Sequence, residues 1–471
     1  TGTLLAIWAI ELVKKLGTQT IPRLGEVSVD GSVLLVTLAI AVGTGLLFGL
    51  VPGLASGKPD LTEALKEGGR GSTSSRRHNR FRNGLVISEV ALALVLLTGA
   101  GLLLKSFVRL QNVNPGFNPQ NVLTAEVSLP ALRYPDDKSQ ANFFAELDRR
   151  VSDLPGVSAF GLTTILPMSG INSDSSFGIE GQVYNDAHPM PDEEIRLVSP
   201  GYFKALQIPL LQGRPFSAAD KQDAPRVVLI NHALAQRYWP NEQPIGKRIT
   251  IYTGNGKAWG TIVGIVSDMH HKGLDQPVAP EYYLPLAQGP YSSMILAVRS
   301  TQDPRSLTNA IRQTVQAIDP ALPIAHVRTL DQVIADSVAP RKLAVVLLAV
   351  FAAVALALAA VGIYGVMSFL VVQRTHEIGV RMALGAQRSD VLRLVIWHAG
   401  ILVGTGTLIG LVAALLSTSA LRTALYQVNA IDLPTFLGVT FVLALVAFVA
   451  SYIPARRATR ADPMIALGHV Q

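Results

Sequence analysis

The sequence predicts a membrane protein, an α-helical transmembrane bundle with a large α+β domain outside the cytoplasm. The chain has 471 residues, of which 49% are hydrophobic and only 15% charged, whereas soluble domains average about 25% charged residues. Several apolar segments approach the ~20 residues that a helix needs to cross a bilayer. One long stretch, residues 105–342, is instead soluble in character and alternates strand and helix patterns.

The candidate spans are separated by loops of alternating basic content. The spans are residues 1–13 (cut short), 33–52, 85–104, 343–372, 394–416 and 434–454. Lysine and arginine are concentrated in residues 53–84, in residues 373–393 and after Pro454, while residues 418–433 hold only Arg422. Basic loops stay in the cytoplasm. We therefore expect a bacterial inner (cytoplasmic) membrane protein with residues 53–84 as a cytoplasmic linker, residues 455–471 as a cytoplasmic tail and a periplasmic or extracellular large domain.

The spans contain small residues and one acid that merit attention. Gly45 with Gly49, and Gly406 with Gly410, have the GxxxG spacing that lets helix backbones approach closely. Glu89 is an acid inside a span, and a carboxylate there is a functional hypothesis by default. Its place about two turns from the cytoplasmic end allows a second interpretation, a partly hydrated side chain.

Two parts of the chain resemble each other at a constant offset. The matched pairs are Asp30 with Asp432, Pro52 with Pro454, Asp60 with Asp462 and Leu65 with Leu467. Residues 1–52 are thus expected to be the last two helices of a first unit, the first of them truncated, and the rest a complete second unit. Repeated membrane halves are typical of transport machinery.

The external stretch predicts two βαβ-like halves that form one subdomain. In the first, "NVLTAEVSL" and "VSAFGLTTILPM" are predicted strands around a helix that begins at an aspartate cap and places Phe143, Phe144, Leu147, Val151 and Leu154 on one face. In the second, "SSMILAVRS" and "PIAHVRTL" flank another helix. Residues from about 200 to 287 are predicted to form an inserted subdomain.

A short charged helix, "QRTHEIGVRMALGA", separates two apolar segments. Glu377 and Arg381 are spaced to pair, Ile378 and Met382 form an apolar knob one turn apart, and Gly385 can end the helix. Such a helix suits docking into a protein groove. The alternative is a solvated connector whose basic residues only fix the topology.

The same motif carries a family resemblance. "QRTHEIGVRMALGA", with "VSPGYFKALQIPLLQGRPF", "PIGKRI", "TIVGIV" and "PARRATRADPMIAL", resembles ABC transporter permeases of the MacB/FtsX type, and the repeat resembles their duplicated branch. The resemblance implies a MacB-like domain at residues 105–342, an FtsX-like three-helix domain at residues 343–454 and a coupling segment at residues 373–389. It also implies that a separate ABC ATPase presses on the coupling segment, through Arg374, Glu377, Ile378, Arg381, Met382 and Gly385.

Several functions lack their sequence signals. The chain has no cysteine and no phosphate-binding G-x-x-x-x-G-K-[ST] motif, so we expect no ATPase activity in it, no catalytic residues and no cofactor. His270 and His271 with Asp268 lack metal-ligand spacing. The net charge of +7 follows the short loops beside the spans, which argues against a nucleic-acid partner.

The sequence thus leads to a permease subunit for export or mechanotransmission, with a periplasmic client or adaptor protein and membrane lipid as further partners. Duplicated units would form a pseudo-dimer; otherwise two chains would form a homodimer. The alternative is a signalling or scaffold membrane protein whose periplasmic domain regulates an envelope enzyme. A membrane-anchored hydrolase is disfavoured because no catalytic spacing is present.

Overall fold

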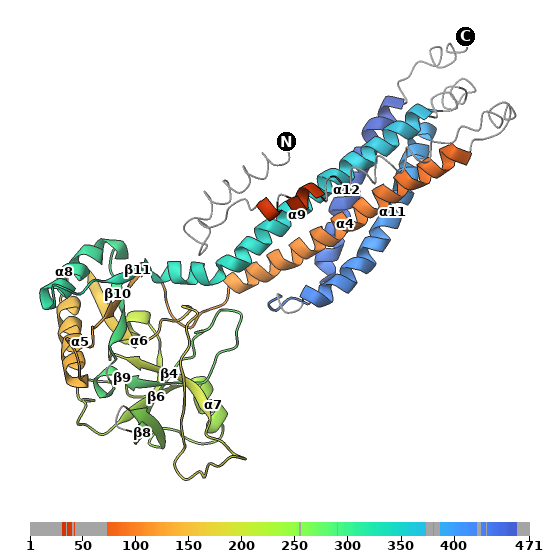
Figure 1. Ribbon diagram of the computed structural model, residues 1–471. Helices are drawn as coiled ribbons and strands as arrows, with labels where there is room; N and C mark the ends of the chain where they lie inside the picture. The colour runs from red at the N-terminus through yellow and green to blue at the C-terminus, as the bar shows by residue number, and fades with distance from the viewer. Residues whose placement is uncertain are drawn as a thin grey trace. The chain divides into compact units, whose positions relative to one another are not determined.

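The computed structural model describes residues 31–33, 35–39, 42, 73–253, 256–289, 291–373, 380, 387–421, 425–429 and 431–458. The chain divides into two compact units, Thr1–Arg109 with Arg341–Gln471, and Leu110–Pro340. The first consists of long helices and the second is built on a mixed sheet (Figure 1). The predicted fold class is confirmed.

The described helices of the first unit are long and apolar. They are α4 (Thr73–Gln111), α9 (Leu330–Gln373), α11 (Arg388–Leu421) and α12 (Leu433–Ala458). Each contains a stretch able to span a membrane by length and composition, at Arg82–Gln111, Leu330–Gln373, Ser389–Thr418 and Leu433–Arg457. These stretches contain the four predicted spans from residue 85 onward. The predicted span 1–13 and most of 33–52 lie outside the described residues.

The bundle packs through small and branched apolar side chains. Val90, Ala93 and Leu94 of α4 are fully buried, and they share a cluster with Met367 of α9 and Ala447 of α12. No hydrophobic effect favours helix association inside lipid, so close packing and interhelical polar contacts must hold the bundle together.

The second unit contains an 11-stranded sheet in which the main path runs β11-β1-β10-β2-β4-β9-β6-β8-β5, with β3 paired to β4 and β7 to β8. The strands are β1 (Val122–Ser128), β2 (Val157–Thr163), β3 (Asp174–Ser176), β4 (Asp192–Val198), β5 (Leu210–Gly213), β6 (Val227–Asn231), β7 (Arg248–Thr253), β8 (Gly256–Val266), β9 (Glu281–Pro285), β10 (Ser293–Ser300) and β11 (Ala325–Thr329). The helices are α5 (Asp137–Ser152), α6 (Tyr202–Leu206), α7 (His232–Tyr238) and α8 (Thr308–Ile318), with the short 3-10 turns Leu286–Gln288 and Pro304–Leu307.

One half of the sheet consists of β11, β1, β10 and β2 under α5 and α8 (Figure 1). Asp136 caps α5 by accepting a hydrogen bond from the Ser139 amide, N to Oδ1 2.7 Å, as aspartate does at helix N-termini. Four of the five apolar residues predicted for one face of this helix are buried, whereas α5 ends at Ser152 and Leu154 lies beyond it, partly buried. The predicted strand and helix positions of this half are confirmed.

The other half has its own core, which includes Phe177, Trp239 and Tyr282. It is joined to the first half by a narrow seam, because β2 and β4 pair only at Thr163 and Val198. Strands β3 and β4 precede residue 200 and already pair within this second half. The limits of the domains and of the inserted subdomain stay predictions.

Candidate functional site

The six predicted coupling residues, Arg374, Glu377, Ile378, Arg381, Met382 and Gly385, lie outside the described residues. So do Gly45 and Gly49. The described chain reaches this segment from both sides, since α9 ends at Gln373 and α11 begins at Arg388.

Gly406 and Gly410 bring α11 against α4. A Cβ atom at Gly406 would lie 2.8 Å from Cβ of Val90, and one at Gly410 would lie 3.0 Å from Cα of Ala91. The first distance is shorter than real Cβ contacts and the second is tighter than most of them, so glycine at these positions allows the close approach of the two helices. Their role in the working protein stays a prediction.

Glu89 lies at the interface of α4 with α9. Its Oε2 atom is buried without a hydrogen-bond partner among the described residues, and a Cβ atom at Gly362 would collide with that oxygen. A glycine therefore makes the room that the carboxyl group occupies. Elsewhere along the same pair of helices, the Arg82 guanidinium lies 3.8 Å from the ring centroid of Phe369.

At the opposite end of α4, polar contacts join it to the segment between α11 and α12. Lys105 Nζ lies 2.6 Å from Oδ1 of Asp432, the Ser106 hydroxyl accepts the Tyr426 amide, and Arg109 donates to the Gln427 carbonyl. Asp432 also caps α12 by accepting from Thr435. The hydrogen bond from Lys105 holds the pKa of Asp432 below its usual range.

Helix α9 begins directly after the edge strand β11. The Gln332 amide donates to the Thr329 hydroxyl, and the Thr329 amide donates to Oε1 of Gln332 at 2.9 Å. This reciprocal pair is a capping box, which satisfies two amides that the first helical turn leaves open. The 44-residue helix therefore starts at a residue that is itself part of the sheet.

The linker that follows α4, residues 112–121, is held by a buried arginine of β10. The Arg299 guanidinium donates to the carbonyls of Asn118, Gln120 and Ala205 at 2.6–2.7 Å. Two of those carbonyls belong to the linker and the third to α6. Since Arg299 is only 8% exposed, its charge is neutralised mainly by these peptide dipoles.

The loop after β8 holds the other side of the linker. The His270 amide donates to the Pro115 carbonyl at 2.9 Å. Gly116 has φ +86°, and a Cβ atom there would lie 2.7 Å from Cα of Met269. The positive φ and the close approach both require glycine.

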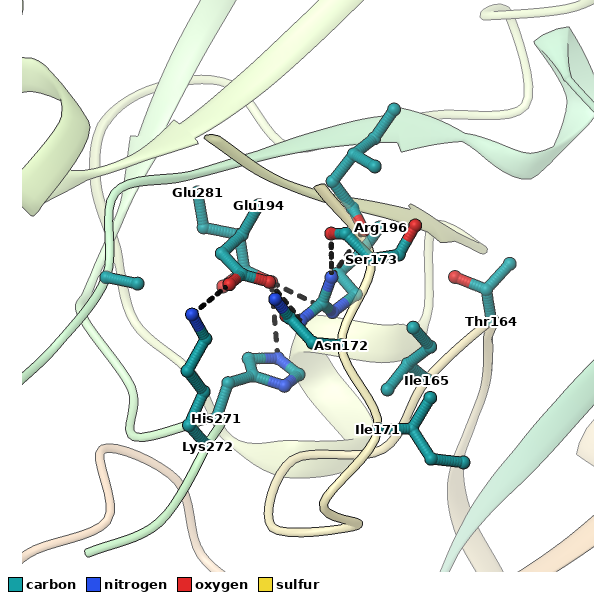
Figure 2. A network of polar contacts seen from close by, with 12 residues as sticks. Thr164, Ile165, Ile171, Asn172, Ser173, Glu194, Arg196, His271, Lys272 and Glu281 are labelled. Carbon is teal, nitrogen blue, oxygen red and sulfur yellow. Dashed lines mark hydrogen bonds and ion pairs between the residues drawn. The ribbon is translucent and has the colours of Figure 1, made fainter. Parts of the chain in front are cut away.

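A cluster of buried charges lies under this loop (Figure 2). Arg196 of β4 is completely buried between Glu194 of the same strand and Glu281 of β9, with N to O distances of 2.9 and 3.3 Å. His271 enters from the loop with Nε2 3.2 Å from Oε1 of Glu281. At the rim, Lys272 reaches Glu194 at 2.9 Å.

Arg196 also ties in the segment before β3. Its guanidinium donates to the carbonyls of Ser173 and Ile195 and to Oδ1 of Asn172. Figure 2 shows these partners converging on the guanidinium from several segments. A fully buried charge of this kind is tolerated only when opposite charges and hydrogen bonds surround it.

Burial shifts the two titratable groups of the cluster in opposite directions. Desolvation raises the pKa of Glu281 to about 7, with Glu194 and Asp268 adding to the rise while Arg196 and Tyr283 oppose it. Desolvation and the nearby charge of Arg196 lower the pKa of His271 well below its usual value. Neither shift is caused by the other member of the pair.

The two histidines and the aspartate considered as a metal site serve different partners. His270 Nδ1 lies 3.0 Å from the Gln276 carbonyl, whereas His271 is buried beside Glu281. Asp268 accepts the Ala233 amide at the start of α7. The described residues contain no group of three potential metal ligands.

Comparison with known proteins matches both parts of the chain. Residues 84–314 match the model of the MacB-like periplasmic core domain, and residues 349–463 that of the FtsX-like permease C-terminal domain. The pyoverdine export ATP-binding/permease protein PvdT of Pseudomonas syringae pv. syringae is 27% identical over 412 residues, covering 83% of this chain and 57% of the relative. The probable syringafactin export ATP-binding/permease protein SyfD of Pseudomonas syringae pv. tomato is 27% identical over 297 residues, covering 59% of this chain and 42% of the relative.

Among solved structures, the periplasmic region of MacB from Actinobacillus actinomycetemcomitans has 13% identity and a TM-score of 0.31, over 48% of this chain and 95% of that one. The chain spans 57% of the length of the PvdT relative. With a match to the MacB-like periplasmic core domain followed by a match to the FtsX-like permease domain, the chain belongs to the MacB/FtsX-type ABC transporter permeases.

Proposed function

We propose that the chain is a permease subunit that couples ATP hydrolysis by a separate ATPase to movement of its extracytoplasmic domain. The movement would serve export or mechanotransmission in a bacterial inner membrane. The relatives named above are export proteins with an ATP-binding part, which supports an ATP-driven process. A cofactor is not part of the proposal.

The single observation that carries the proposal is the course of α9. One helix of 44 residues, ~66 Å at 1.5 Å per residue, begins in a capping box on β11 and ends at Gln373, the first residue of the predicted coupling segment. A push on that segment therefore acts on a helix that starts in the sheet. The described helices share a hydrophobic cluster in which buried polar groups such as the Glu89 carboxyl are few, and this mostly apolar packing favours transmission of movement over a polar path through the bundle.

The proposed contact with the ATPase uses Arg374, Glu377, Ile378, Arg381, Met382 and Gly385 of the coupling segment. A compact amphipathic helix with an apolar knob suits a groove on a partner. The duplicated chain would supply both halves of the complex as a pseudo-dimer, or two chains would form a homodimer. A periplasmic client or adaptor and lipid complete the proposed partners.

Co-purification tests the proposal. Full-length protein in mild detergent is expected to retain an ATPase subunit, measured as ATP hydrolysis, and Glu377→Arg and Met382→Asp are expected to lose it. Glu242→Arg, an exposed charge reversal in the extracytoplasmic domain, is the matched control and should retain the activity. If the coupling variants retain the ATPase as the wild type does, the proposed contact is wrong.

A scaffold that regulates an envelope enzyme is the competing function. It predicts that a bound enzyme co-purifies through the extracytoplasmic domain and that its activity is unchanged by ATP. Loss of that regulation on ATP depletion would instead support coupled movement.

A further inference from the structure

We propose that Glu281 and His271 form a buried anchor that keeps the linker after α4 fixed to the sheet over the range of pH met outside the cell, because the proton that one group releases on opening is taken up by the other. The inference rests on the proposed function, because a domain that is moved through α4 and α9 needs a firm joint at each helix. At α9 the connection to the sheet is the capping box of Thr329 and Gln332. At α4 the connection is less direct, because the helix ends at Gln111 and the linker of residues 112–121 follows.

The linker depends on the loop after β8. Pro115 accepts the His270 amide, and Gly116 packs against the backbone of Met269. Arg299 and α6 hold only the later part of the linker, at Asn118 and Gln120. The part that comes first after α4 is therefore only as firm as the loop.

The loop in turn depends on His271. Its ring is almost completely buried beside Glu281, and its carbonyl accepts the Met168 amide at 2.8 Å. The neighbouring Lys272 is half exposed and reaches Glu194 only at the rim. Withdrawal of the imidazole into water would release the loop from the sheet.

The charged and titratable groups around the imidazole come from every element packed on it. They are Arg196 and Glu194 from β4, Glu281 and Tyr283 from β9, Tyr202 from α6, and Asp268 and Lys272 from the loop. Tyr202 and Tyr283 stay protonated, because burial raises the pKa of both phenols. Glu281 and His271 are the two groups whose burial in the closed joint shifts the pKa across the weakly acidic range, upward for the carboxyl and downward for the imidazole.

The sign of each contribution follows from linkage. In the closed joint Glu281 has a raised pKa, so it binds its proton more tightly than in water and favours the closed state as the pH falls from about 7. His271 has a lowered pKa, so its proton uptake favours the open state as the pH falls below its usual value of ~6.5. Between pH ~4.5 and ~6.5 the proton is on the Glu281 carboxyl in the closed joint and on the His271 imidazole in the open one. Opening then takes up no net proton, so the opening equilibrium does not depend on pH over about two pH units.

The test is hydrogen–deuterium exchange of the full-length protein in lipid nanodiscs between pH 5 and 7.5, corrected for the intrinsic exchange rate. The readout is protection of residues 112–121 and of the loop after β8. The wild type is expected to show nearly constant protection from pH 5 to 6.5. His271→Gln should lose protection as the pH rises, and Glu281→Gln should lose it as the pH falls, each by up to about tenfold per pH unit.

The two slopes of opposite sign are the signature of the anchor, since a residue that only fills space gives no pH slope. The double variant should be flat. His326→Gln and Glu126→Gln form the matched control, because this pair is more exposed and 3.9 Å apart on the same domain. A steep slope in the wild type, or slopes of the same sign in the two single variants, would overturn the anchor.

If Glu281→Gln does not fold, the wild type and His271→Gln still decide the matter, because the anchor requires a flat profile in the first and a loss of protection with rising pH in the second. The measurement uses no ATPase, so a failure of the proposed ATPase contact leaves this result standing. Conversely, a flat profile in both single variants removes the anchor without touching the coupling helix.

Discussion

Replacing Arg299 with methionine should loosen the later part of the linker after α4, which the guanidinium holds at Asn118 and Gln120. The methionine fills most of the space but donates none of the three hydrogen bonds to Asn118, Gln120 and Ala205. A hydrogen bond from a charged group contributes about 1.5–3 kcal/mol. The stabilisation by these hydrogen bonds is partly offset, because burying the guanidinium is itself unfavourable. The same desolvation lowers the pKa of Arg299. A net loss of about 3 kcal/mol corresponds to ~100-fold in the opening equilibrium.

The assay is hydrogen–deuterium exchange of residues 118–121 at fixed pH in the full-length protein. Arg299→Met should exchange ~100-fold faster there than the wild type. Arg312→Met is the control, because Arg312 is exposed on α8 and donates to Asn309. Exchange in the linker that is unchanged by Arg299→Met would show that the guanidinium does not hold it, and the assignment of this joint would have to be abandoned.

Three further changes test other parts of the structure. Phe144→Ala, at a side chain that is 1% exposed, should cost about 3–5 kcal/mol, measured as a lower unfolding midpoint of the extracytoplasmic domain. Gly410→Leu should lower the melting temperature in detergent because the α4 backbone lies 3.0 Å from its Cβ position, whereas Gly438→Leu, which meets open space, should not. Lys105→Met and Asp432→Asn should show a coupling of about 0.2–1 kcal/mol in a double-mutant cycle. That coupling should disappear in acid, because a carboxyl with a lowered pKa stabilises only above its usual pKa and loses the effect as the pH falls through the folded value.

The helices and strands were predictable where the local pattern alone decides burial. The face of α5 that carries Phe143, Phe144 and Leu147 follows from helical spacing, and the long apolar runs of α9, α11 and α12 follow from length. The extension of α9 back to Leu330 also had a signal, since Thr329 and Gln332 have capping-box spacing. Asp432 also stood out in the sequence, because its counterpart Asp30 occupies the same position in the internal repeat.

The buried cluster was not predictable in the same way. Glu194 and Arg196 are two residues apart and therefore on one face of β4, which would normally indicate a solvent-facing side of the strand. That face is covered by a loop more than 70 residues later and by the strand of Glu281. Tertiary packing between distant segments decides the burial, and His270-His271 gave no sign of which histidine would face inward.

The two connections to the helices converge on one strand. The linker after α4 leads directly into β1, and α9 leaves from β11, which pairs with β1 at Leu123 and Thr329. The Thr124 hydroxyl adds a bond to the Arg328 carbonyl at 2.9 Å. A displacement shared by α4 and α9 would thus move this edge of the sheet as one body, whereas a displacement of one helix along the other would shear the β1–β11 pairing.

That pairing is short and has an irregular register between Thr124 and Glu126, so it is poorly suited to bear shear. By contrast, β1 and β10 pair in register along the whole of β1, from Val122 to Ser128. Under the proposed function, joint movement of the two helices would keep the β1–β11 pairing intact and carry the first half of the sheet with it. The second half would follow through the Thr163–Val198 seam, while the ion pairs of Arg196 hold β4 to β9 within that half.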